Sequence, residues 1–143
     1  MKGPKAFDAL SKLTANTSWR NRIESAGLRG LFELGDKRAF EPAYRLATDA
    51  SRPIAVRLAA IAVVSSTGKG DPRAFPLIFD RFRKALDAQD FDELVRALES
   101  LIELADPRGQ QAFDLMKAKF KDDPALMSGV NFYEQQFKAA LKK

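Results

Sequence analysis

The chain has 143 residues, of which 45% are hydrophobic and 30% are charged, a balance typical of one globular domain that can bury a core. It contains no cysteine and no histidine, which excludes disulfides, thiol catalysis, thiolate and imidazole metal sites and a serine–histidine pair. The net charge of +5 comes from 24 basic and 19 acidic residues interspersed along the chain, a mild indication of an acidic partner. The longest stretch without a charge, residues 58–68, is too short to cross a membrane, so we expect no membrane span.

A five-residue pattern recurs along the chain at steps of 33, 35 and 35 residues. A period of this size is typical of the helical hairpins that stack into an α-solenoid. The pattern itself predicts a helix start, because Asp can accept from the free amides of a first turn and Pro gives up an amide that needs no partner there. The four pentads are Gly3-Pro4-Lys5-Ala6-Phe7, Asp36-Lys37-Arg38-Ala39-Phe40, Asp71-Pro72-Arg73-Ala74-Phe75 and Asp106-Pro107-Arg108-Gly109-Gln110.

The first element along the chain is the second half of such a hairpin. Phe7, Leu10 and Leu13 follow the first pentad at helical spacing, but no first helix precedes them. A solenoid helix without its neighbour exposes an apolar flank, so we expect that more protein precedes Met1 in nature.

Apolar residues at three- and four-residue spacing predict two helices for each later unit. The first helices carry Ile23, Leu28, Leu31 and Leu34; Ile54, Leu58, Ile61 and Val64; and Leu94, Leu98, Leu101 and Ile102. The second helices carry Phe40, Ala43, Tyr44 and Ala47; Phe75, Phe79, Phe82 and Leu86; and Ala112, Phe113, Met116 and Phe120.

Capping residues predict where the first helices begin. The expected starts are Ser18 before Trp19, whose ring we expect to staple the helix start, then Ser51 with Pro53 just inside, and Asp90 with Glu93 three residues on. Pro42 and Pro76 each remove an amide near the start of a second helix, which predicts a kink or a late start.

A last helix opens at Asp123-Pro124 and closes the predicted stack. We place Phe132, Tyr133, Phe137, Ala140 and Leu141 on its packed face and Lys138, Lys142 and Lys143 elsewhere. The predicted fold is therefore all-α: residues 1–143 form one domain, an α-solenoid of about three full repeats plus a leading half-repeat and a C-terminal capping helix.

These units resemble HEAT-like repeats of the short bacterial type, in which a Val-Arg-x-x-Ala helix leads to a Gly-Asp-Pro-Arg-Ala corner and a second helix. The matching residues are Val56-Arg57-Leu58-Ala59-Ala60 and Gly70-Asp71-Pro72-Arg73-Ala74. The resemblance covers about residues 3–120 and implies an α-solenoid of HEAT-like helical hairpins.

A narrower resemblance, over residues 18–75, is to the C-terminal helical domain of bacterial zinc aminopeptidases of the aminopeptidase N family. It rests on Ser18-Trp19-Arg20, Leu28-Arg29-Gly30-Leu31-Phe32-Glu33-Leu34-Gly35-Asp36 and Thr67-Gly68-Lys69-Gly70-Asp71-Pro72-Arg73. In that family a His-Glu-x-x-His helix and a later Glu of another domain hold the zinc. No residue of this chain can supply those ligands, so no catalytic or metal residue is carried over.

Two groups of basic residues are candidates for a partner surface, and a third cluster is similar to the second. Arg38, Arg73 and Arg108 recur in register, as a basic ladder would, although an Asp–Arg pair that holds adjacent units together is the favoured interpretation. Arg81, Arg83 and Lys84 lie beside Phe79 and Phe82, and Lys117, Lys119 and Lys121 lie near Phe120. Aromatics interleaved with charges occur in nucleic-acid binders, but here the aromatics fall on the core stripe, which favours a solvated basic face.

The sequence thus predicts a non-catalytic scaffold domain that binds protein, without cofactor or metal. The narrower resemblance implies that it shapes access to, or packs on, the catalytic domain of a zinc aminopeptidase. The alternative is a basic nucleic-acid-binding repeat, favoured by a pI near 9.6.

Overall fold

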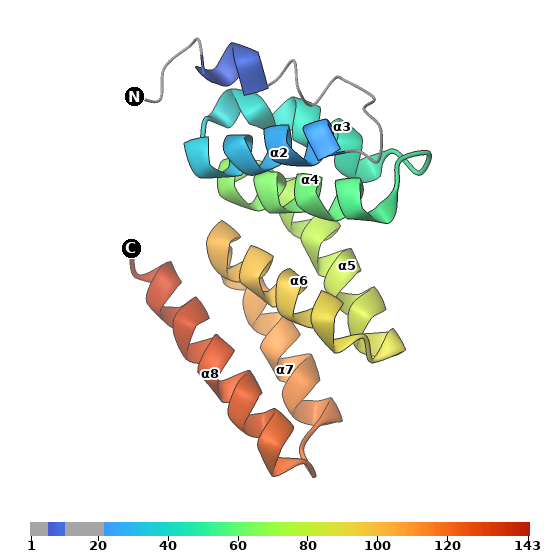
Figure 1. Cartoon of the computed structure of the whole chain (residues 1–143). Coiled ribbons are helices and arrows are strands. Elements are labelled where there is room, and N and C mark those ends of the chain that lie inside the picture. Colours follow the sequence, from blue (N-terminus) through green and yellow to red (C-terminus); the bar gives the residue numbers. More distant parts are fainter. Residues whose placement is uncertain (1–5, 11–21) are drawn as a thin grey trace. The chain divides into compact units, whose positions relative to one another are not determined.

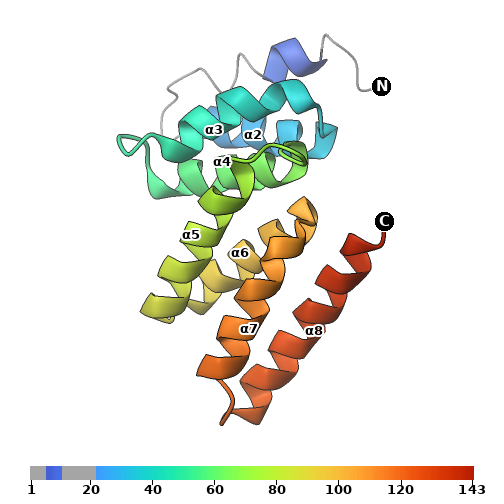
Figure 2. The ribbon, with the colours of Figure 1, turned by 180° about the vertical axis from the view of Figure 1, so that it is seen from behind.

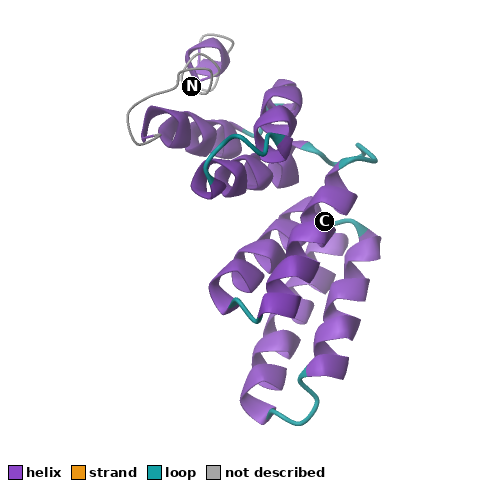
Figure 3. Cartoon of the chain, turned by 90° about the vertical axis from the view of Figure 1, so that its right-hand side faces the viewer, coloured by secondary structure: helices purple, strands orange, loops and turns teal. Residues whose placement is uncertain are grey.

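The computed structural model describes residues 6–10 and 22–143, and every regular element in these ranges is a helix (Figure 3). This confirms the all-helical prediction. The predicted Ser18 cap and the Trp19 staple lie outside the described residues. Internal contacts divide the chain into two compact units, Met1–Gly68 and Lys69–Lys143, which we call the N-terminal and the C-terminal unit. Within residues 6–10 and 22–143, no helix is both long enough and apolar enough to cross a membrane.

The N-terminal unit is built around α4, which contacts both α2 and α3 (Figure 1). Leu28, Leu31, Phe40 and Ala43 supply buried side chains from α2 and α3. Gly30 of α2 leaves room for the side chain of Leu10, which belongs to the helical segment at residues 6–10. The elements are α2 (Arg22–Leu34), the 3-10 turn η2 (Lys37–Ala39), α3 (Phe40–Thr48) and α4 (Ile54–Thr67).

One predicted stripe of this unit is wrong in part. Ile61 and Val64 of α4 are buried as predicted, but Ile54 is 46% exposed. Because α4 is apolar on most of its circumference, its sequence does not single out one packed face. Its other buried residues include Val56 and Ala60.

In the C-terminal unit, α5 packs on α6, and α8 packs on both α6 and α7. The turn at residues 120–123 joins α7 to α8, which run antiparallel and side by side in two opposite views (Figures 1 and 2). Phe82, Phe113 and Phe137 are fully buried. The elements are α5 (Ala74–Ala88), α6 (Phe91–Leu104), the 3-10 turn η3 (Pro107–Gly109), α7 (Gln110–Lys119) and α8 (Pro124–Leu141).

Aspartate side chains cap α6, α8 and the 3-10 turns at the corners, whereas α3, α4, α5 and α7 begin without a side-chain cap. Asp90 accepts a hydrogen bond from the Glu93 amide at 3.2 Å, as predicted. The predicted Ser51 cap is wrong: α4 begins at Ile54, and the Ser51 hydroxyl instead donates to Asp49 Oδ1 at 2.6 Å. Asp49 is the stronger acceptor within reach, so Ser51 stabilises the turn before α4.

Pro42 and Pro76 are each the third residue of their helix, because α3 begins at Phe40, after η2, and α5 at Ala74. The late start predicted for these helices is confirmed. A proline in the first turn removes an amide that has no partner inside the helix.

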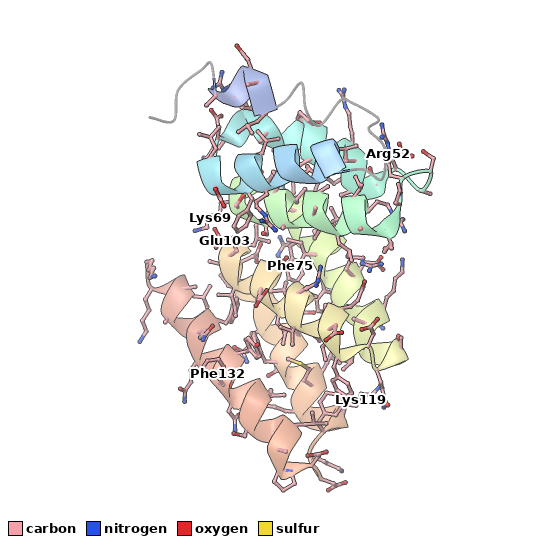
Figure 4. All side chains as sticks on the ribbon, in the orientation of Figure 1. Arg52, Lys69, Phe75, Glu103, Lys119 and Phe132 are labelled. Atoms are coloured by element: carbon pink, nitrogen blue, oxygen red, sulfur yellow. The ribbon has the colours of Figure 1, made fainter. Side chains whose placement is uncertain are left out.

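The packed face predicted for α8 is wrong in part. Phe137 is fully buried, but Phe132 is 57% exposed (Figure 4). The buried residues of α8 are Val130, Glu134 and Phe137, so the helix is rotated relative to the aromatic face that the sequence predicted.

Candidate functional site

The three corners begin with a residue in the left-handed conformation. The φ angles of Gly35, Gly70 and Ala105 are 63°, 86° and 54°, and the three positions are 35 residues apart. Each of these residues stands directly before the aspartate of a corner. Gly35 and Ala105 also directly follow the last residues of α2 and α6, where they turn the backbone out of the helix, whereas Gly70 lies three residues beyond Thr67, the end of α4. The sequence period therefore corresponds to a repeated backbone geometry.

Each corner aspartate is bound twice by the arginine two residues later. Its Oδ1 accepts from the backbone amide of that arginine at 2.9 Å in all three corners. Its two carboxylate oxygens also accept from the guanidinium, with Nη2–Oδ2 distances of 2.6, 3.0 and 2.7 Å. The Asp–Arg pairs predicted from the sequence are thus present in all three corners, but each joins residues of one corner and does not hold adjacent units together as predicted. They are Asp36–Arg38, Asp71–Arg73 and Asp106–Arg108.

These pairs hold both partners in their charged forms. The hydrogen bonds from the arginine side chain lower the pKa of each corner aspartate below its ordinary value. The same bonds raise the pKa of Arg38 and Arg108. Each corner therefore carries an internally compensated charge pair near neutral pH.

Two corner arginines also lie over the phenylalanine of the preceding pentad. The guanidinium carbon of Arg38 is 4.1 Å from the centre of the Phe7 ring. That of Arg108 is 4.5 Å from the centre of the Phe75 ring. A guanidinium over an aromatic face contributes a cation–π attraction. Arg38 and Arg108 thus each contact the phenylalanine of the preceding pentad through its ring rather than through an aspartate.

The second basic group is divided among separate contacts. Arg81 of α5 pairs with Glu93 of α6, and Lys84 pairs with Asp80 one turn earlier at 3.0 Å. Arg83 is exposed and has no carboxylate partner within the described ranges. The structure therefore does not gather the three candidates on one open basic patch.

The aromatic residues beside this group stack on one another. The Phe79 ring lies 5.2 Å from the Phe75 ring and 5.7 Å from the Phe82 ring, and Phe82 is fully buried. The ring faces therefore contact one another along α5, as the core-stripe interpretation predicts, and do not form a surface on which nucleotide bases could stack.

The net positive charge is confined to the N-terminal unit. Counting along the sequence, Met1–Gly68 has 11 basic and 6 acidic residues, whereas Lys69–Lys143 has 13 of each. The basic clusters on α5 and α7 thus lie in a unit without net charge. An acidic partner would meet excess positive charge only in the N-terminal unit.

Sequence reasoning missed Glu134, a carboxylate buried between α7 and α8. Its side chain is 7% exposed. It accepts from Gln110 Nε2 at 2.6 Å and from Lys117 Nζ at 2.7 Å, with Lys138 Nζ at 3.7 Å. Burial raises the pKa of Glu134, but the hydrogen bonds from Lys117 and Gln110 outweigh it and the pKa lies below its ordinary value. Its spacing from Val130 and Phe137 places it on the same face as these residues, but the α8 sequence alone does not show that this face is buried.

The described residues contain no group of three or more acidic side chains arranged to hold a metal ion. The groups with shifted pKa values are engaged in pairs that stabilise corners or join helices.

The chain was also compared with known proteins. No protein-family model matches the sequence, and the searches of curated proteins and of solved structures return no similar protein.

Proposed function

We propose that the chain is a non-catalytic HEAT-like helical-repeat module that binds another protein through the outer surfaces of its helices. The observation that supports this most directly is the corner geometry, with left-handed residues at 35-residue steps, each followed by the same Asp–Arg clamp. Repeat modules of this kind act through shape and burial rather than through a reacting group.

The use of the charged groups supports the same proposal. The corner aspartates and Glu134 have lowered pKa values because they are paired. Paired groups of this kind hold helices in place and have no free proton-transfer role. These charged groups therefore serve to hold the helices in fixed positions.

We further propose that the protein partner is the catalytic domain of a zinc aminopeptidase of the aminopeptidase N family, which this module packs against. The support is the set of matching residues in the first corner and at the start of the second, including Gly35-Asp36 and Gly68-Lys69-Gly70. The test is the natural reading frame upstream of Met1. A His-Glu-x-x-His segment there is the expected result, and an upstream frame without one overturns this parentage.

A binding measurement tests the proposal directly. If the upstream frame encodes a zinc-binding domain, that domain and this chain can be produced separately and mixed in a calorimeter. Saturable association is expected. Absence of association at about 100 µM of each partner contradicts the proposal, because a standard-sized interface binds more tightly than that.

The salt dependence of DNA binding distinguishes the nucleic-acid alternative from the proposed function. The proposal predicts no retention of duplex DNA by the chain even at low salt, since most basic side chains of the candidate clusters are paired. Binding that weakens steeply between low and physiological salt would support phosphate contacts and contradict the protein-binding function.

A further inference from the structure

The outward face of α8 carries an exposed stripe at helical spacing. Val130, Glu134 and Phe137 are buried on the opposite side. Phe132, at 57% exposure, is the most exposed large hydrophobic residue of the described chain. The stripe consists of Ala125, Gly129, Phe132, Gln136 and Ala139, all of them exposed, and we call it the outer stripe.

This face has almost no charge. In a chain with 30% charged residues, residues 124–137 contain a single one, Glu134, and its side chain is buried. A terminal helix that caps a repeat stack ordinarily has a polar outer face. The uncharged outer stripe with an exposed aromatic residue at its centre is instead typical of a surface that packs against another helix.

Small residues flank the aromatic residue on the outer stripe. A Cβ atom on Gly129 would meet no other atom within 4 Å, so the space beside Phe132 is open. Glycine and alanine let two helix axes approach to about 8 Å, so a second helix can pack closely along this stripe.

The charges at the two ends of α8 are complementary to those of a second, antiparallel copy of the same helix. Asp122 and Asp123 stand at its start, and Lys138, Lys142 and Lys143 at its end. If two copies of α8 pack antiparallel with the two-fold axis near Phe132, the acidic start of each faces the basic end of the other. A parallel pair would bring like charges together, so the complementarity selects the antiparallel arrangement.

We propose that the outer stripe of α8 is a self-association surface, on which a second copy of this chain packs its own α8 antiparallel. In this arrangement Phe132 packs at the two-fold axis and Gly129 of one copy faces Gln136 of the other. The contact runs along a helix of 18 residues, about 27 Å, so the dimer is weak and depends on concentration. Self-association through α8 is independent of the partner proposed above.

Sedimentation equilibrium of the full 143-residue chain from about 1 µM to about 1 mM tests the proposal. The expected result is a reversible dimer with a dissociation constant on the order of 10 to 100 µM. Phe132→Glu should raise that constant at least about tenfold, because it places like charges at the two-fold axis. A chain that stays monomeric throughout overturns the proposal and leaves the outer stripe to a different partner.

Leu115→Glu is the matched control. Leu115 is 42% exposed on α7 and lies outside the outer stripe, so the same charge change there should leave the dissociation constant unaltered. Circular dichroism should give both variants the helix content of the parent chain. A dimer weakened equally by both substitutions would not be formed through α8 and would overturn the assignment.

Cross-linking tests the orientation. The chain has no cysteine, so a single introduced cysteine can form a disulfide only with another copy. An equimolar mixture of Gly129→Cys and Gln136→Cys should cross-link several-fold faster under mild oxidation than either variant alone, since residues about 5 Å apart can form a disulfide. Faster self-linking of each single variant would show a parallel pair and overturn the antiparallel arrangement.

Discussion

A Cβ atom on Gly109 would lie 2.9 Å from Cζ of Phe137, so α8 approaches the corner between α6 and α7 closely enough to require glycine there. Phe137 is fully buried, and its ring centre lies 5.3 Å from that of Phe113. The earlier corners have Ala39 and Ala74 at this position. The third corner thus has glycine instead of alanine at this position of the pattern, because α8 packs against that corner.

Gly109→Ala should lower the free energy of unfolding by about 1 to 3 kcal/mol, because the added methyl group must displace a ring that is already fully packed. Urea unfolding monitored by circular dichroism at neutral pH measures the change.

Gly129→Ala is the control for that substitution. Gly129 is exposed inside α8 with open space around it, so alanine should raise the free energy of unfolding by about 0.5 to 1 kcal/mol. If Gly109→Ala unfolds at the same urea concentration as the parent chain, the contact of Phe137 with the corner does not contribute to stability.

The sequence was sufficient to predict the helices and corners because their signals are local. Asp90 and Asp123 lie at helix starts because their carboxylates accept from amides three residues later. Asp36, Asp71 and Asp106 lie in equivalent corners because each pairs with an arginine only two residues away.

The face of α8 could not be predicted in this way because it depends on side chains distant in sequence. The aromatic residues alone favoured a packed face containing Phe132, whereas Gln110 and Lys117 of α7 bring Glu134 inward. A buried carboxylate is stable only beside such partners, and the α8 sequence does not reveal them. The same holds for Arg38 and its contact with the Phe7 ring, which joins residues 31 positions apart.

Ala105→Gly should raise the free energy of unfolding by up to about 1 kcal/mol. Ala105 has φ 54°, a conformation that costs a residue with a Cβ atom more than it costs glycine, and the relief exceeds the extra freedom of the unfolded chain. Gly35 occupies the equivalent position with φ 63°, so Gly35→Ala should have the opposite effect. Thermal unfolding measures both, and a lower melting temperature for Ala105→Gly contradicts the prediction.

Glu134→Gln should lower the free energy of unfolding at pH 7 by about 1 to 3 kcal/mol, because Lys117 loses its charged acceptor. The folded-state pKa of Glu134 lies below its ordinary value of 4.5. The contribution of the carboxylate is therefore fully present above pH 4.5 and is lost as the pH falls through the lowered pKa. Urea unfolding of the variant and the parent chain between pH 7 and pH 3 should show the gap closing in acid.

Glu103→Gln is the control for the Glu134 substitution. Glu103 is exposed on α6 (Figure 4), so removing its charge should change the free energy of unfolding by less than about 0.5 kcal/mol at any of these pH values. Equal losses in the two variants would mean that the loss reflects net charge rather than the contact with Lys117.

Substitutions of Asp106 can distinguish the two functions of a corner carboxylate, which accepts from a backbone amide and pairs with the arginine side chain. Asp106→Asn keeps an oxygen that can accept from the Arg108 amide but loses the charge that holds the guanidinium, whereas Asp106→Ala loses both. Asp106→Ala should lower the free energy of unfolding by about 1 to 2 kcal/mol and Asp106→Asn by less.

The effect of Asp106→Asn should depend on pH, because the hydrogen bond from Arg108 lowers the pKa of Asp106. The loss of stability should be present above pH 3.8 and disappear as the pH falls through the lowered pKa. Urea unfolding at pH 7 and at pH 2 measures this, and an Asn variant as unstable as the Ala variant at pH 7 would mean that the charge pair, rather than the cap, stabilises the corner.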